Sequence, residues 1–93
     1  MTAVSPDRIH RQALAVAVDG ESAMANGQFK LAADLFEMAS SLAFTAAIHV
    51  DAAADTPRYR FFKQASADLR DRRFAALDAL DRLEHPEDYV GEQ

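Results

Sequence analysis

Residues 26–39, NGQFKLAADLFEMA, decide the fold of this chain. Gly27 permits a sharp turn, because glycine adopts the left-handed backbone conformation at little cost. After the turn, Ala32, Phe36 and Ala39 recur at intervals of four and three, which places them on one face of a helix. The stretch therefore predicts a tight helical hairpin, in which small residues let two helices come close and Phe36 fills the space between them.

The helix before this turn is expected over residues 5–26. Ser5, Pro6 and Asp7 form a helix start, with a hydroxyl cap, a proline in the first turn and an acid near the positive helix end. Gly20 is expected to face the second helix, because a glycine inside a helix costs about 1 kcal/mol against alanine and close packing offsets that cost. The inner face of this helix repeats at helical spacing through Ile9, Ala13, Val16, Ala17, Gly20, Ala23 and Met24.

Two further helices are expected over residues 28–50 and 57–84. Asp55 or Thr56 can cap the third helix, and Pro57 fits its first turn. The inner stripe of the second helix is Leu31, Ala32, Leu35, Phe36, Ala39, Leu42, Ala43 and Ala46. The inner stripe of the third helix is Phe62, Ala65, Leu69, Ala76, Leu80 and Leu83.

Pro86 ends the third helix, and residues 85–93 form an acidic tail. No alternating pattern typical of strands is present. Short connections make helices that follow each other in sequence neighbours in space. The sequence therefore predicts an all-α fold, an antiparallel three-helix bundle that occupies residues 1–93 as a single domain.

The composition places the chain among small soluble proteins. It has 93 residues, of which 49% are hydrophobic, and it contains no cysteine, which excludes disulfides and thiolate metal sites. There is no secretion signal, and no apolar run approaches the roughly 20 residues of a membrane span. We therefore expect a cytoplasmic protein without a membrane partner.

The hairpin resembles a known helical repeat. Six positions are similar to the small and aromatic positions of a tetratricopeptide (TPR) hairpin: Gly20, Gly27, Phe29, Ala32, Phe36 and Ala39. The pattern does not recur 34 residues later, where the corresponding residues are Phe61, Lys63, Ser66, Arg70 and Arg73. Phe44 stands where a proline usually closes the repeat. The chain therefore has one such hairpin, whose apolar face the third helix must cover.

One hairpin closed by a third helix resembles the microtubule interacting and trafficking (MIT) domain. The small and aromatic residues from Ala13 to Ala46 are similar to the first two helices of that family, and the third helix matches it in general character. The resemblance implies a compact three-helix domain that binds short helical or extended peptide motifs in grooves along its third helix.

Several apolar residues face away from the predicted inner stripes. Leu14 and Val18 lie on a second face of the first helix, Phe44 and Ile48 lie opposite the stripe of the second, and Phe74 projects from the third. Two interpretations stay open. The bundle buries more than one face of each helix, or these residues form a surface for a partner or a second copy.

The charge of the chain is unevenly distributed. Net charge is −5 overall, yet residues 58–83 hold seven basic and four acidic side chains. These basic residues form a solvated face, in which Asp68 can pair with Arg72 and Asp78 with Arg82, or they attract an acidic protein segment. Nucleic acid is the third reading, disfavoured because the chain is acidic. The basic residues considered are Arg58, Arg60, Lys63, Arg70, Arg72 and Arg73.

No group of residues points to catalysis, so we expect a protein that is not an enzyme and uses no cofactor. Ser40 and Ser41 have no base beside them in the sequence. Among the histidines only His49 with Asp51 suggests a metal pair, and a structural histidine is the simpler reading. The hypothesis is a protein–protein interaction module, an adaptor or small regulatory subunit that binds a helical or peptide segment or itself. The alternative is a nucleic-acid-associated regulator that uses the third helix. The expected partner-binding residues are Leu14, Val18, Phe44, Ile48, Phe74, Arg70 and Arg73, and the tail residues Tyr89 and Val90 could occupy the same site.

Overall fold

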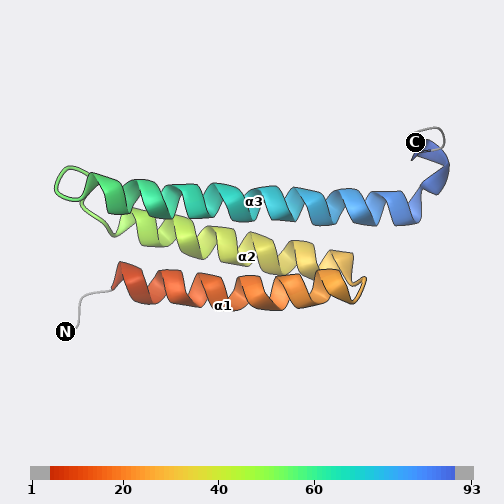
Figure 1. The fold of residues 1–93 in the computed structure, drawn as a ribbon, viewed down its shortest axis with the longest axis horizontal. Coiled ribbons are helices and arrows are strands. Elements are labelled where there is room, and N and C mark those ends of the chain that lie inside the picture. The colour runs from red at the N-terminus through yellow and green to blue at the C-terminus, as the bar shows by residue number, and fades with distance from the viewer. Residues whose placement is uncertain (1–4, 90–93) are drawn as a thin grey trace.

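The computed structural model describes residues 5–89, and these residues form three long helices (Figure 1). The helices are α1 (Pro6–Ala25), α2 (Phe29–Ile48) and α3 (Thr56–Glu84), and a short 3-10 turn, η1 (Pro86–Tyr89), follows. Their ends differ from the expected ends by at most two residues. No strand is present in the described part, so the predicted all-α three-helix bundle is confirmed.

The helix ends are fixed by local hydrogen bonds. The side chains of Ser5 and Asp55 each accept the backbone N–H three residues later, at 3.4 and 3.3 Å. Thr56, the other candidate cap of α3, instead donates its hydroxyl to the carbonyl of Ala52 at 2.7 Å. Gly27 has a φ of +74°, which is the left-handed conformation that the turn between α1 and α2 requires.

α2 is the central helix, and it packs against both α1 and α3. α1 and α3 make few contacts with each other, and in Figure 1 they lie on opposite sides of α2. Ten of the fifteen buried apolar residues in the described part are alanines, and Phe36 and Phe62 are the largest buried side chains. Small residues bring each outer helix close to α2, and buried residues of all three helices meet in two hydrophobic clusters along the bundle.

α2 is also the most apolar of the three helices. In the described residues it is the one helix that is long and apolar enough to cross a membrane by length and composition. The same composition is required of a central helix whose residues are buried against two neighbours, and seven residues of α2 are buried in this way.

The contact between α1 and α2 depends on Gly20. A Cβ atom at this position would lie 2.8 Å from Cε1 of Phe36, closer than such atoms approach in proteins. The expectation that Gly20 faces the second helix is therefore correct, because the ring of Phe36 occupies the volume that a side chain would need.

The contact between α2 and α3 depends on two serines. The hydroxyl of Ser40 donates to the carbonyl of Ser66 at 2.9 Å, and the hydroxyl of Ser66 donates to the carbonyl of Ser40 at 3.0 Å. The bonds are reciprocal, so they fix the register of the two helices while both hydroxyl groups stay satisfied.

Two leucines of the predicted inner stripes are exposed instead. Leu31 is 47% exposed. α3 covers the side of α2 that carries Ser40 and the buried residues Ala33 and Ala47. Leu31 lies on another side of α2, which neither neighbouring helix covers. Leu83 is 65% exposed, because α3 has 29 residues and α2 only 20, so the last turns of α3 extend beyond the α1–α2 turn (Figure 1).

Replacement of Gly20 tests the close packing of the hairpin. We expect Gly20→Leu to cost about 1–3 kcal/mol, because the new side chain must displace the buried ring of Phe36. Thermal unfolding should then show a melting temperature lower by several degrees, since about 1 kcal/mol corresponds to roughly 4–8 °C in a domain of this size.

Ala15→Leu, which adds the same side chain at an exposed position of α1, is the matched control and should leave the melting temperature nearly unchanged. Phe36→Leu should recover part of the loss when combined with Gly20→Leu. A higher melting temperature for Gly20→Leu, as helix propensity alone predicts, would show that the contact is not tight.

Candidate functional site

The apolar residues proposed to face outward are all exposed. Their side chains range from 48% exposed at Phe44 to 66% at Val18, so the interpretation that they are packed inside the bundle does not hold. Sequence reasoning missed other exposed apolar residues, because it placed them on inner stripes or did not consider them. These are Leu31, Met38, Phe61 and Leu83.

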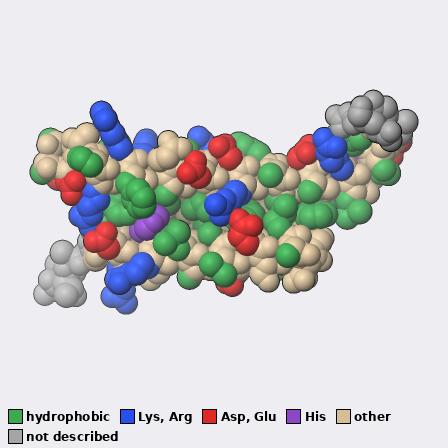
Figure 2. All heavy atoms as spheres, viewed as in Figure 1, with side chains coloured by type: hydrophobic (Ala, Val, Ile, Leu, Met, Phe, Trp, Pro, Cys, Tyr) green, Lys and Arg blue, Asp and Glu red, His purple; other side chains and the backbone are tan. Residues whose placement is uncertain are grey.

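The exposed residues lie on different surfaces of the molecule. Leu14 lines a groove between α1 and α3 with a volume of about 260 Å³. In Figure 2, apolar side chains gather along the line where these two helices face each other. We call this the α1/α3 groove, and its apolar lining is Leu14 and Ala17 from α1 and Phe61, Ala65 and Leu69 from α3.

Two ion pairs cross from α1 to α3 near the ends of this groove. Asp7 lies 2.6 Å from Arg58, and Glu21 lies 2.9 Å from Arg72. In both pairs the residues are 51 positions apart, so the two helices run parallel with a constant register over this length. Arg72 thus pairs across the groove and not with Asp68, the partner expected from sequence spacing. The side chains of each pair meet at their charged ends, so the distance between α1 and α3 corresponds to the length of two side chains.

His10 forms one end of the apolar wall. Its ring lies 5.2 Å from the ring of Phe61 and 5.0 Å from that of Phe62, and its Nδ1 atom is buried without a hydrogen-bond partner. Burial lowers the pKa of His10 below its ordinary value, an effect that the nearby carboxylate of Asp7 partly opposes. The neutral imidazole therefore acts as an aromatic wall of the groove.

A second surface lies where α2 and α3 meet on their outer sides, and we call it the α2/α3 face. The ammonium group of Lys63 lies 5.2 Å from the ring centre of Phe44 and 5.9 Å from that of Tyr59. The guanidinium of Arg73 lies 5.8 Å from the ring centre of Phe74. Cations thus lie over aromatic rings along this face, and the rings of Phe44 and Phe74 are about half exposed.

The arginines of α3 divide into two groups. Arg58, Arg72 and Arg73 have carboxylate neighbours on α1 or α2, the last at 3.8 Å from Glu37. Arg70 is exposed and lies two turns after Lys63 on the α2/α3 face, and it makes no ion pair among the described residues. Of the two predicted pairs within α3, Asp78 with Arg82 is present at 3.0 Å.

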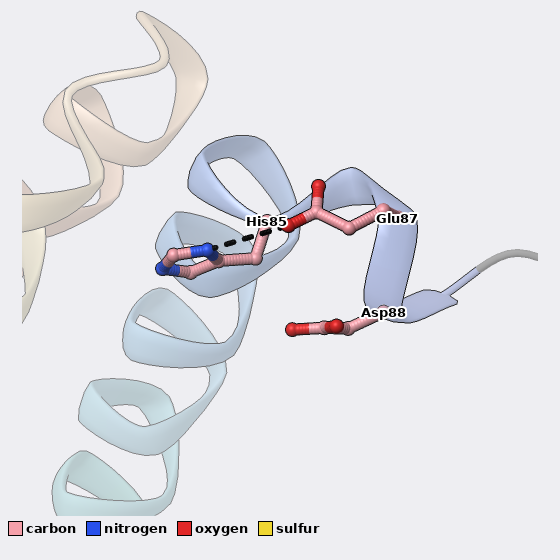
Figure 3. Close-up of side chains that lie close together, drawn as sticks. All are labelled: His85, Glu87 and Asp88. Atoms are coloured by element: carbon pink, nitrogen blue, oxygen red, sulfur yellow. Dashed lines mark ion pairs between the residues drawn. The ribbon is translucent and has the colours of Figure 1, made fainter.

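The described residues contain one group with the ligand types of a metal site, and it differs from the histidine pair that the sequence suggested. His85, Glu87 and Asp88 place their ligand atoms within 4.8 Å of one another, with 3.7 Å between His85 and Glu87 (Figure 3). All three side chains are exposed, and exposed acidic groups of this kind are common without an ion. No metal site is therefore assigned to them.

The described part of the acidic tail, residues 85–89, packs against the end of α3. The hydroxyl of Tyr89 donates a hydrogen bond to Asp81, which is the main reason that the pKa of Tyr89 is raised to about 12. The guanidinium of Arg82 lies 4.5 Å from the centre of the same ring. Tyr89 is thus held at the end of its own helix and does not occupy the α2/α3 face, and Val90 lies outside the described residues.

Comparison with known proteins adds nothing to this geometry. No protein-family model, curated protein or solved structure matches the chain. Of the two candidate nucleophiles, Ser40 and Ser41, the hydroxyl of Ser40 is hydrogen-bonded to Ser66 and serves the helix contact. The described residues thus present two surfaces with exposed apolar side chains, the α1/α3 groove and the α2/α3 face.

The environment of His10 predicts how stability depends on pH. The folded state lowers the pKa of His10, so the unfolded chain binds a proton more readily, and stability is lost as pH falls through the ordinary value of 6.5. We expect the melting temperature to fall between about pH 7.5 and 5.5, and to fall less in His10→Gln.

His49→Gln removes a histidine at an exposed position and is the matched control. It should keep the pH dependence of the unmodified protein. Equal pH dependence in His10→Gln and the unmodified protein would contradict the burial of a neutral His10, and the imidazole proton signals of His10, followed by NMR, would show its titration directly.

Proposed function

We propose that this chain is a non-enzymatic protein–protein interaction module that binds a helical or extended segment of a partner protein in the α1/α3 groove. The observation that carries the proposal is the open apolar groove between two parallel helices that ion pairs hold in register. Such a module would act as an adaptor or small regulatory subunit, and we place it in the cytoplasm. Its tight hairpin with a third helix also resembles the TPR and MIT architectures, in which helical grooves take peptides.

The size of the groove supports a peptide over a small molecule. Its volume of about 260 Å³ is below the ~300–1,000 Å³ of typical small-molecule sites. A shallow groove of this size suits apolar side chains that project from a longer chain. A partner helix presents apolar anchors at spacings of three and four residues. The groove runs along α1 and α3, so it can accept several such anchors along its length.

The arginines beside the groove are already paired, so a partner would be selected there by apolar contacts and not by charge. Arg58 and Arg72, the arginines that border it, are already neutralised by Asp7 and Glu21. The acidic flank that sequence reasoning expected on the partner would be recognised by Arg70 and Arg73, and these lie on the α2/α3 face. An acidic partner therefore fits that face better than it fits the groove.

The same ion pairs weigh against the alternative, a regulator that binds nucleic acid through α3. Binding of phosphates needs an unpaired positive surface, and three arginines of α3 have carboxylate neighbours in a chain of net charge −5. A gel shift with DNA and RNA at low and high salt separates the two functions, because salt-sensitive binding would favour the nucleic-acid reading.

Peptides selected from a random display library test the groove. We expect selected peptides to share apolar anchors, and their addition should shift NMR signals of Leu14, Ala65 and Leu69. Leu14→Gln should weaken binding by roughly tenfold or more, because burial of a leucine side chain contributes about 1.5–3 kcal/mol.

Val18→Gln is the matched control: it also replaces an exposed apolar side chain of α1 by glutamine, one turn later and outside the groove lining, and it should leave peptide affinity unchanged. Peptides that bind equally well to Leu14→Gln, or that shift signals only on the α2/α3 face, would show that the groove is not the binding site.

A further inference from the structure

α3 has a second stripe of residues in addition to the one that packs against α2. Its members alternate at spacings of three and four, the pattern by which helices pair along their length. Phe74, near the middle of this stripe, is 52% exposed. We call it the α3 outer stripe: Arg60, Lys63, Ala67, Arg70, Phe74, Leu77 and Asp81.

The charge of α3 changes sign from one end to the other. Residues 56–70 carry four basic and one acidic side chain, whereas residues 78–84 carry one basic and three acidic side chains. A helix with this charge gradient repels a parallel copy of itself, because like charges meet along the whole contact. It attracts an antiparallel copy, in which each basic half meets an acidic half.

We propose that two copies of this chain associate through the α3 outer stripe, with their α3 helices antiparallel and a two-fold axis between Arg70 and Asp71. In two antiparallel helices related by this axis, two residues lie opposite each other when their numbers add up to the same total as 70 and 71. It places each basic residue of the stripe opposite an acid: Arg70 faces Asp71 of the partner subunit, Lys63 faces Asp78 of the partner subunit, and Arg60 faces Asp81 of the partner subunit.

The same register also matches the apolar residues. Phe74 lies opposite Ala67 of the partner subunit, so a large side chain meets a small one twice, once on each side of the axis. Phe44 lies beside the stripe, since Lys63 covers its ring at 5.2 Å, and Ile48 follows Phe44 by one turn of α2. The contact is therefore self-complementary in charge and in size, as a two-fold interface requires.

The area of the contact shows which elements must take part. A helix of 29 residues is about 43 Å long and roughly 10–12 Å wide, so its face alone covers about 450 Å². A standard interface buries about 800 Å² on each partner, which needs Phe44 and Ile48 of α2 in addition to α3. The four helices α2 and α3 of both copies would then enclose the contact, with both α1 helices outside it.

This association is separate from peptide binding in the α1/α3 groove. The groove uses Leu14 and Phe61, and the proposed contact uses Phe44 and Phe74 on the other side of α3. Either proposal can therefore fail while the other holds.

Charge reversal tests the contact with the full chain. Sedimentation velocity at several concentrations and low salt should show dimers for the unmodified protein. Arg60→Glu with Lys63→Glu leaves Arg70 as the one basic side chain of the contact, and Asp78→Lys with Asp81→Lys leaves Asp71 as its one acidic side chain, so each double variant should be a monomer. An equimolar mixture of the two should dimerise again, and high salt should weaken every dimer.

Arg8→Glu with Arg11→Glu reverses two exposed charges of α1 and is the matched control, which should dimerise like the unmodified protein. Circular dichroism checks that all variants stay helical. A protein that is monomeric at every concentration overturns the proposal, as does a mixture of the reversed variants that stays monomeric.

Disulfide trapping tests the orientation, since the chain has no cysteine of its own. Arg60→Cys mixed with Asp81→Cys should give a covalent heterodimer on mild oxidation, because the antiparallel register brings these positions together. Either variant alone should give little covalent dimer, because its two cysteines would lie about 31 Å apart along the helices. Efficient crosslinking of Arg60→Cys alone would indicate a parallel contact and overturn the proposed geometry.

Discussion

The close approach of α2 to both of its neighbours is the constraint on which this structure depends. The ring of Phe36 fills the volume left by Gly20 on one side, and the reciprocal bonds of Ser40 and Ser66 hold the other side. Both contacts need small residues, because a larger side chain at any of these points would separate the helices. α2 thus forms two tight pair interfaces, and the groove between α1 and α3 is the space that these two pairings leave.

An alanine core also explains why so many large apolar side chains lie outside. Burial contributes roughly in proportion to apolar area, about 25 cal/mol per Å², so an alanine adds far less than a leucine or a phenylalanine. The chain keeps Phe36 and Phe62 inside and leaves Phe44, Phe61 and Phe74 substantially exposed. A small domain with an alanine-rich core gains stability when its exposed aromatic residues are covered, so the proposed association would also stabilise the fold.

Sequence patterns predicted the local features because local physics determines them. The caps at Ser5 and Asp55, the turn at Gly27 and the outward position of Phe74 follow from hydrogen bonding, backbone conformation and helical period. The same period could not show that α3 would cover the side of α2 opposite Leu31, because a sequence does not state where a second neighbour lies around a helix. The pairing of Arg72 with Glu21 depends on the parallel register of α1 and α3, which only the three-dimensional packing fixes.

The distribution of cations on α3 separates its two outer surfaces. Arg58 and Arg72 point toward α1 and are neutralised there, whereas Lys63 and Arg70 on the α2/α3 face make no ion pair among the described residues. Charge that is satisfied within one chain stabilises its groove, and charge that is left unsatisfied can select a partner of opposite sign. In a dimer built on the free cations, the two α1/α3 grooves would lie on the outside, related by the two-fold axis. A partner with two apolar segments could then occupy both grooves at once, and its second contact would form at high effective concentration, so modest affinity in each groove would suffice for stable binding.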